Sequence, residues 1–164
     1  MTSIKKYILI VVLLMSSQVA QAQKPHPVGK ILEVFQTKAG ELKLIKVDDK
    51  FIGETNFLII LGRKTIYATQ DDVFGSVSFH TLFKAISTSD VVLVKETFTP
   101  GGCSQFRLLK LESNKTFTLS DRFGNCSDVP IITQQGDKIT FDFSDDNHSK
   151  SATYVYRNGK LNKS

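Results

Sequence analysis

Apolar and polar residues alternate along most of the chain beyond residue 30, and turn-forming residues interrupt the alternation at short, regular intervals. Successive side chains of a β-strand point to opposite faces, so a period of two is typical of a strand with one buried face. In residues 138–143, for example, the apolar positions 139, 141 and 143 would share one face. The pattern predicts an all-β fold, an antiparallel sandwich or small barrel of about nine or ten short strands.

Turn signals divide this pattern into hairpins. Expected pairs are 31–36 with 41–47, 106–111 with 116–120, and 130–133 with 138–143. The run Val91-Val92-Leu93-Val94 lacks alternation and predicts a buried strand within residues 90–97. Asn158-Gly159 is a strong tight-turn signal, and it is expected to end the last long strand, residues 152–156.

Residues 75–87 fit two periods. Positions 77, 79, 81 and 83 alternate as in a strand, whereas positions 79, 82, 83 and 86 would also share one face of a short helix. We predict a strand, because β-branched and aromatic residues and the strand-rich surroundings favour it.

The first 22 residues have the pattern of a secretory signal peptide. Lys5 and Lys6 precede an apolar run at 7–15, and Ala20-Gln21-Ala22 supplies a cleavage site. The alternative is a membrane anchor, but nine helical residues span only about 14 Å of a roughly 30 Å hydrocarbon core. We therefore expect a signal peptide at 1–22, a flexible lead-in at 23–29 and a single β domain at 30–164. The expected location is the periplasm of a Gram-negative bacterium or the exterior.

Composition fits one globular domain. The chain has 164 residues, of which 41% are hydrophobic and 23% charged, which excludes overall disorder and a multi-pass membrane protein. Removing Lys5 and Lys6 lowers the formal net charge from +5 to +3. The remaining cations are scattered, whereas a nucleic-acid binder concentrates them in a stripe, so we expect no nucleic-acid partner.

Cys103 and Cys126 are expected to form a disulfide, because thiols of small exported domains usually pair. On the chain-entropy view, a bridge closing a loop of this length stabilises the fold by roughly 3.4 kcal/mol. The alternative is a metal-binding or catalytic thiol, which the absence of a C-x-x-C spacing disfavours.

No catalytic motif is present, so we expect a protein that is not an enzyme and has no metal or cofactor. The histidines are His26, His80 and His148, and none has a partner that its spacing specifies. The oxygen-rich positions Asp142, Asp145, Asp146 and Asn147 do not follow the spacing of a calcium loop, and we interpret them as a solvated polar loop.

The most distinctive stretches are Gly101-Gly102-Cys103 and residues 123–128, Phe-Gly-Asn-Cys-Ser-Asp. Either they form two disulfide-linked loops with a structural role only, or the disulfide holds a rigid surface that binds a partner. In the second interpretation the contact candidates are Arg122, Phe123, Asn125 and Asp128, because arginine and aromatic residues are common interface anchors.

These stretches, with residues 90–94 and 152–156, resemble a group of small exported all-β proteins of proteobacteria. The resemblance covers roughly the second half of the chain and implies fold and compartment only. In size and plan the chain is more loosely similar to periplasmic lysozyme inhibitors and immunity proteins. It lacks the inhibitors' Ser-Gly-x-x-Tyr motif and is net basic, whereas an inhibitor of a basic lysozyme gains from an acidic face.

Two classes of function follow. The first is a non-catalytic binding protein of the envelope, of inhibitor or immunity type, with a protein partner. The alternative is a structural or accessory envelope protein, or a module that binds a small ligand or a glycan.

Thiol counting provides a direct test of the predicted bridge. The exported protein, unfolded without reductant, is expected to show no free sulfhydryl, because both cysteines are consumed. Two free thiols per chain would contradict the prediction, and reduced protein is the positive control.

Overall fold

The computed structural model describes residues 29–48, 55–69, 74–86, 88–99, 101–126, 129–144 and 150–164. The predicted signal peptide and residues 23–28 of the predicted lead-in lie outside the described residues.

Thirteen strands form three antiparallel sheets in the described residues. In spatial order, the first sheet contains β1 (Lys30–Thr37), β2 (Gly40–Asp48), β3 (Thr55–Leu61) and β4 (Lys64–Ala68). The central sheet contains β5 (Phe74–Ile86), β6 (Ser89–Phe98), β7 (Ser104–Glu112) and β8 (Phe117–Leu119), and β9 (Phe123–Cys126) also pairs with β7. The third contains β10 (Ile131–Gln135), β11 (Lys138–Phe143), β12 (Ala152–Arg157) and β13 (Lys160–Lys163).

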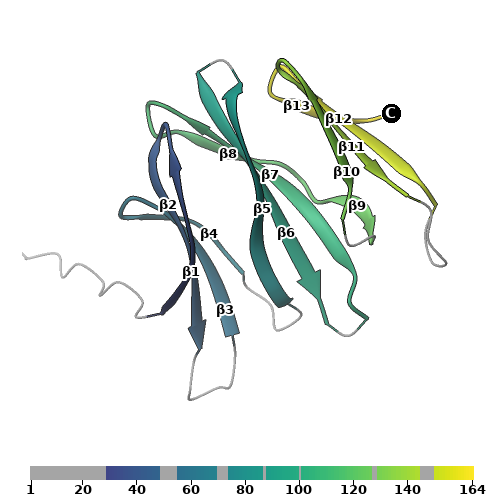
Figure 1. Cartoon of the computed structure of the whole chain (residues 1–164). Coiled ribbons are helices and arrows are strands. Elements are labelled where there is room, and N and C mark those ends of the chain that lie inside the picture. Colours follow the sequence, from purple (N-terminus) through teal and green to yellow (C-terminus); the bar gives the residue numbers. More distant parts are fainter. Residues whose placement is uncertain are drawn as a thin grey trace, which may run out of the picture.

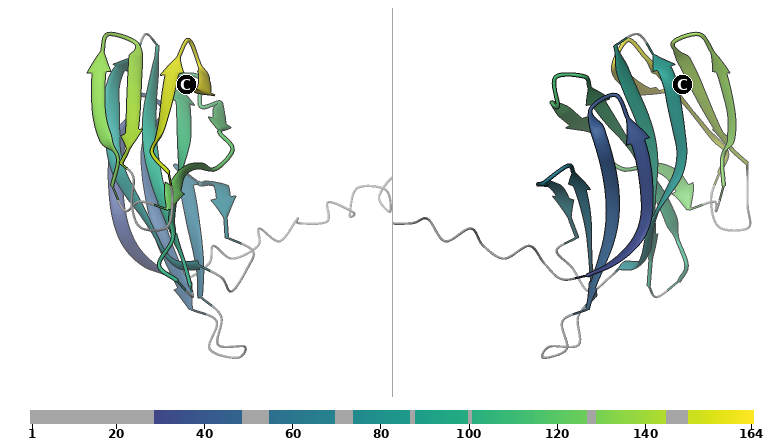
Figure 2. Two further views of the ribbon diagram at one scale, coloured as in Figure 1. Left: turned by 90° about the vertical axis from the view of Figure 1, so that its right-hand side faces the viewer. Right: turned by 60° about the vertical axis from the view of Figure 1, so that its left-hand side comes forward.

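The three sheets lie side by side as layers, with β5–β9 in the middle (Figures 1 and 2). One face of the central sheet meets the first sheet in a core that includes Leu44, Ile59 and Val92. Its other face meets the third sheet in a core that includes Leu93 and Phe141. The expected all-β, antiparallel architecture is confirmed, and it takes the form of three stacked sheets with two separate cores.

The central position of β6 explains its unbroken apolar run. Val92 and Val94 belong to the core beside the first sheet, whereas Val91 and Leu93 belong to the core beside the third. Because both faces of the strand are buried, neither set of alternate positions needs to be polar. The unbroken apolar run at 91–94 therefore indicates both a buried strand and a strand that lies in the middle layer.

Two strands occupy segments that the sequence analysis left outside strands, which is one reason why the observed number exceeds nine or ten. The β13 strand pairs with β12 beyond a turn at Asn158 and Gly159, where both residues have positive φ angles of 51° and 79°. Its sequence, Lys-Leu-Asn-Lys, has too little apolar content to be recognised. The β9 strand contains Gly124 and Asn125, and it forms because β7 supplies an edge.

Residues 75–86 of the ambiguous segment form most of β5, so the predicted strand is confirmed, but its alternation is interrupted. The pairing of β5 with β6 shifts between Phe79 and Thr81, which marks a β-bulge. As a result Val77 and Phe79 lie in the first core, whereas Phe83 lies in the second. The bulge lets one strand contribute large side chains to both layers.

The second core depends on Phe141, whose ring lies 5.3 Å from that of Phe123 and 6.1 Å from that of Phe83, centroid to centroid. We expect Phe141→Ala to lower the free energy of unfolding by about 3–5 kcal/mol, because the close-packed layers cannot collapse fully onto the cavity. The control is Val34→Ala at an exposed position of β1, which is expected to change the free energy of unfolding by less than about 0.5 kcal/mol. Urea denaturation followed by circular dichroism measures both, and equal losses would contradict the prediction.

Candidate binding surface

A disulfide fixes the end of β9. Cys103 and Cys126 are bonded, with their Cα atoms 4.5 Å apart, so the predicted pairing is confirmed. Cys126 lies opposite Ser104, the first residue of β7. The bridge therefore closes the two paired strands at the edge of the central sheet and holds β9 in register.

The backbone conformation within β9 requires a glycine at position 124. Gly124 has a φ of +114°, which L side chains rarely adopt. A Cβ atom there would also lie 3.3 Å from Cε1 of Phe143 and 3.4 Å from Cδ2 of Phe106. The backbone of β9 can thus lie against the aromatic side chains of the second core, which directs Phe123 inward.

Arg122, the residue before β9, is anchored to a fully buried glutamate. Its Nε donates to Oε2 of Glu96 at 2.7 Å, and the Glu96 side chain has no exposed area. The guanidinium also lies over the ring of Phe98, 5.1 Å from the centroid. Arg122 keeps 36% of its side chain exposed, so it joins a buried carboxylate to the surface of the protein.

The Glu96 carboxylate has two further partners, a hydroxyl and a guanidinium, between the first and central sheets. The Tyr67 hydroxyl donates to its Oε1 at 2.6 Å, and Nε of Arg107 lies 3.2 Å from the same oxygen. The second distance fits an ion pair, although the N–H is not aligned for a hydrogen bond. Burial and the bond to Glu96 raise the pKa of Tyr67 to about 12. One buried carboxylate therefore fixes side chains from β4, β7 and the segment before β9.

Arg122 lines a hollow of about 430 Å³ between the segment before β9 and the β12–β13 hairpin. We call it the Arg122 hollow, and its principal lining residues are Asp121, Arg122, Phe123, Tyr154, Lys160 and Lys163. The Lys163 ammonium lies over the Tyr154 ring, 5.9 Å from its centroid. The hollow therefore combines three cationic side chains with an aromatic wall and one carboxylate.

The four candidates from the sequence have different positions. Arg122 is at the rim of the hollow, as a contact residue would be. Phe123 lines the hollow but is only 4% exposed, because most of its side chain packs among the aromatic residues of the second core. Asn125 donates through Nδ2 to the carbonyls of Ser144 and Lys150, both at 2.9 Å. Asp128 lies outside the described residues.

The hairpin side of the hollow was missed by sequence reasoning. Tyr154 lies in β12, which matches the predicted strand 152–156, but it was not named as a contact candidate. Lys160 and Lys163 lie in β13, which was not predicted. The Asn158-Gly159 signal could have identified them, because a tight turn after a strand predicts a second strand that folds back along the first.

The other polar candidates have structural partners where they are described. His80 contacts Oγ1 of Thr81 at 2.8 Å, and burial, with a smaller contribution from Lys95, lowers its pKa. Asp142 accepts a 2.7 Å hydrogen bond from Thr153 on the neighbouring strand. The remaining candidates lie outside the described residues: His26, Asp145, Asp146, Asn147 and His148.

Within the part of the chain that the structure describes, no helix is long and apolar enough to cross a membrane. Comparison with protein-family models, with curated proteins and with solved structures found no match.

The anchoring of Arg122 predicts an asymmetric response to two substitutions. Glu96→Gln keeps the shape but leaves two arginines without a countercharge, and we expect it to lower the free energy of unfolding by about 3 kcal/mol. Tyr67→Phe removes one hydrogen bond and should cost about 1.5 kcal/mol. Urea denaturation at neutral pH measures both values, and a smaller loss for Glu96→Gln than for Tyr67→Phe would refute this account.

Proposed function

We propose that this chain is an exported, non-catalytic binding protein of inhibitor or immunity type, and that it docks a protein partner at the Arg122 hollow. The observation that supports the proposal is the fixation of Arg122 by Glu96 and Phe98 at the rim of a hollow with an aromatic wall. Arginine and aromatic side chains are enriched among the residues that contribute most to protein–protein affinity.

Preorganisation is the physical reason for choosing this hollow. A free arginine side chain loses substantial rotamer entropy when a partner immobilises it. Here the ion pair with Glu96 and the contact with Phe98 have already restricted Arg122 in the unbound protein. The disulfide at Cys126 likewise restricts β9, the strand that begins at the residue after Arg122. A partner would therefore bind without having to order this part of the surface.

The charge of the rim indicates the chemistry of the partner. Lys160 and Lys163 contribute two positive charges to the lining, against one negative charge from Asp121, and Arg122 shares the single charge of Glu96 with Arg107 and so adds further positive charge. An acidic surface on the partner would be attracted over several ångströms and would associate faster at low salt. We propose an acidic protein, such as a hydrolase or toxin that reaches the envelope, as the target class.

Export belongs to the same proposal. The pattern of residues 1–22 is that of a secretory signal peptide, and a disulfide persists in an oxidising compartment. Both features favour the periplasm or the exterior as the place where the partner is met.

A charge-reversal variant tests the binding surface. The mature protein with its disulfide intact is used to capture partners from envelope extract and from supernatants of competing strains. We expect Lys160→Glu/Lys163→Glu to weaken the affinity for a captured acidic partner about tenfold, because like charges then face each other. Surface plasmon resonance at two salt concentrations measures the change.

The matched control is Lys30→Glu/Lys138→Glu, which alters two exposed lysines outside the Arg122 hollow by the same total charge. An equal loss of affinity in both double variants would show a general charge effect and would reject the Arg122 hollow as the docking site. The absence of any stoichiometric protein partner would favour the alternative, a structural role or a small-ligand module.

A further inference from the structure

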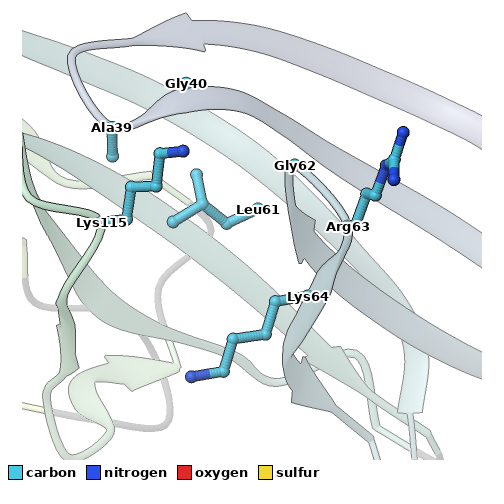
Figure 3. A pocket seen from close by; sticks show the side chains of 7 residues that line it. All are labelled: Ala39, Gly40, Leu61, Gly62, Arg63, Lys64 and Lys115. Carbon is cyan, nitrogen blue, oxygen red and sulfur yellow. The ribbon is translucent and has the colours of Figure 1, made fainter.

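A second hollow, of about 560 Å³, lies between the first sheet and the β7–β8 turn. Its lining comes from the β1–β2 turn, the β3–β4 turn and Lys115, and Figure 3 shows these side chains from close by. Figure 2 (right) shows the three turns near one end of the layered stack. The volume is within the range of roughly 300–1,000 Å³ that is usual for small-molecule sites.

Cations border this hollow, which we call the lysine hollow. Arg63, Lys64 and Lys115 are among the seven residues that line it, and none of the seven is acidic. Figure 3 shows Lys115 reaching across toward Ala39, while the Arg63 guanidinium points away. Lys64 places its ammonium over the Phe117 ring, 5.3 Å from the centroid. In Figure 3 the Lys64 ammonium points away from Lys115 and Leu61, so the two ammonium groups lie on opposite sides of the hollow. Both side chains are exposed, and each can reach a bound anion by rotation about its side-chain bonds.

The base of the lysine hollow is apolar. Leu61 lies between the lysines in Figure 3, and Ala39 faces the same space. Both belong to the first core and are almost fully buried. Leu61 and Ala39 expose little area themselves, but most of the surface that lines the hollow is apolar. A purely inorganic anion would leave that lining in contact with water, whereas a ligand with an apolar body would cover it.

The walls of the hollow are held in place by two backbone contacts. The amide of Lys38 donates to Oδ2 of the buried Asp90 at 2.6 Å, which ties the β1–β2 turn to the central sheet. The amide of Gly62 donates to the carbonyl of Glu41 at 2.8 Å, which ties the β3–β4 turn to β2. The hollow is thus formed by anchored turns, so it exists before a ligand arrives.

We infer that the lysine hollow binds an amphiphilic anion, with a phosphate or carboxylate group near Lys64 and Lys115 and an apolar body against Leu61 and Ala39. This site is separate from the Arg122 hollow, since the two share no lining residue. The same head group could belong to a free amphiphile or to a lipid in a bilayer, and the test below distinguishes these sources.

The experiment titrates the mature protein with decyl phosphate below its micelle concentration and follows the amide signals of Gly40 and Gly62 by ¹H–¹⁵N NMR. Saturable shifts at both glycines are expected, with tighter binding than for inorganic phosphate. Lys64→Gln/Lys115→Gln is expected to weaken binding about tenfold, the effect of two exposed charge pairs. Both lysines are exposed, so the variant should fold as the wild type does.

The control for surface charge is Lys160→Gln/Lys163→Gln, which should bind decyl phosphate as tightly as the wild type. A parallel arm measures cosedimentation with phosphatidylglycerol vesicles. If Lys64→Gln/Lys115→Gln loses vesicle binding and the control variant does not, the anion is assigned to a lipid head group. If the wild type binds free decyl phosphate but not vesicles, the anion is assigned to a soluble amphiphile. Equal affinities for decyl and inorganic phosphate, unchanged affinity in that variant, or no saturable shift at Gly40 and Gly62 would overturn the inference.

Discussion

Burial of the central sheet on both faces is the constraint on which the rest of the structure depends. The residues Val91 to Val94 of β6 supply apolar side chains to two cores, so each outer sheet must cover one of them. An exposed face of this sheet would present a large apolar area to water. Glu96 is on the same strand and is equally buried, which requires the arginines that neutralise it. The position of Arg122 at the surface is thus a consequence of the layering.

The sequence predicted local structure well and the stacking of sheets poorly. Alternation identifies strands, and hairpin turns identify their partners, because both depend on neighbouring residues. Which sheet lies against which depends on contacts such as that of Phe123 with Phe141, whose positions are far apart in the chain. The bulge in β5 adds a second difficulty, since it moves Phe83 to the opposite face from Phe79. Strict alternation would have placed both in one core.

Part of the Arg122 hollow could be predicted from the sequence. The disulfide close to Arg122 follows from the two cysteines, whereas the β9 strand that the disulfide ends was not predicted. The anchor of Arg122 was present in the pattern but not recognised, because Glu96 shares its face of β6 with Val92 and Val94. A carboxylate on an apolar face needs cations that local sequence does not identify. The lysines of β13 were missed because a short polar strand shows no alternation of apolar and polar residues. Tyr154 was missed although its strand was predicted, because local sequence does not show that this strand lies beside Arg122.

The order of strands has a consequence for how the chain folds. Each sheet is built from consecutive segments, and, apart from the pairing of β7 with β9, every strand pairs with a neighbour in sequence. Such pairings close short loops, which places the molecule toward the rapid end of the rates seen for all-β domains. The cysteines belong to the middle segment and are 23 positions apart. On the proposed route of export, a chain that emerges amino end first would complete the first sheet, then the disulfide-bonded central sheet, and finally the third sheet, which covers the second face of the central one.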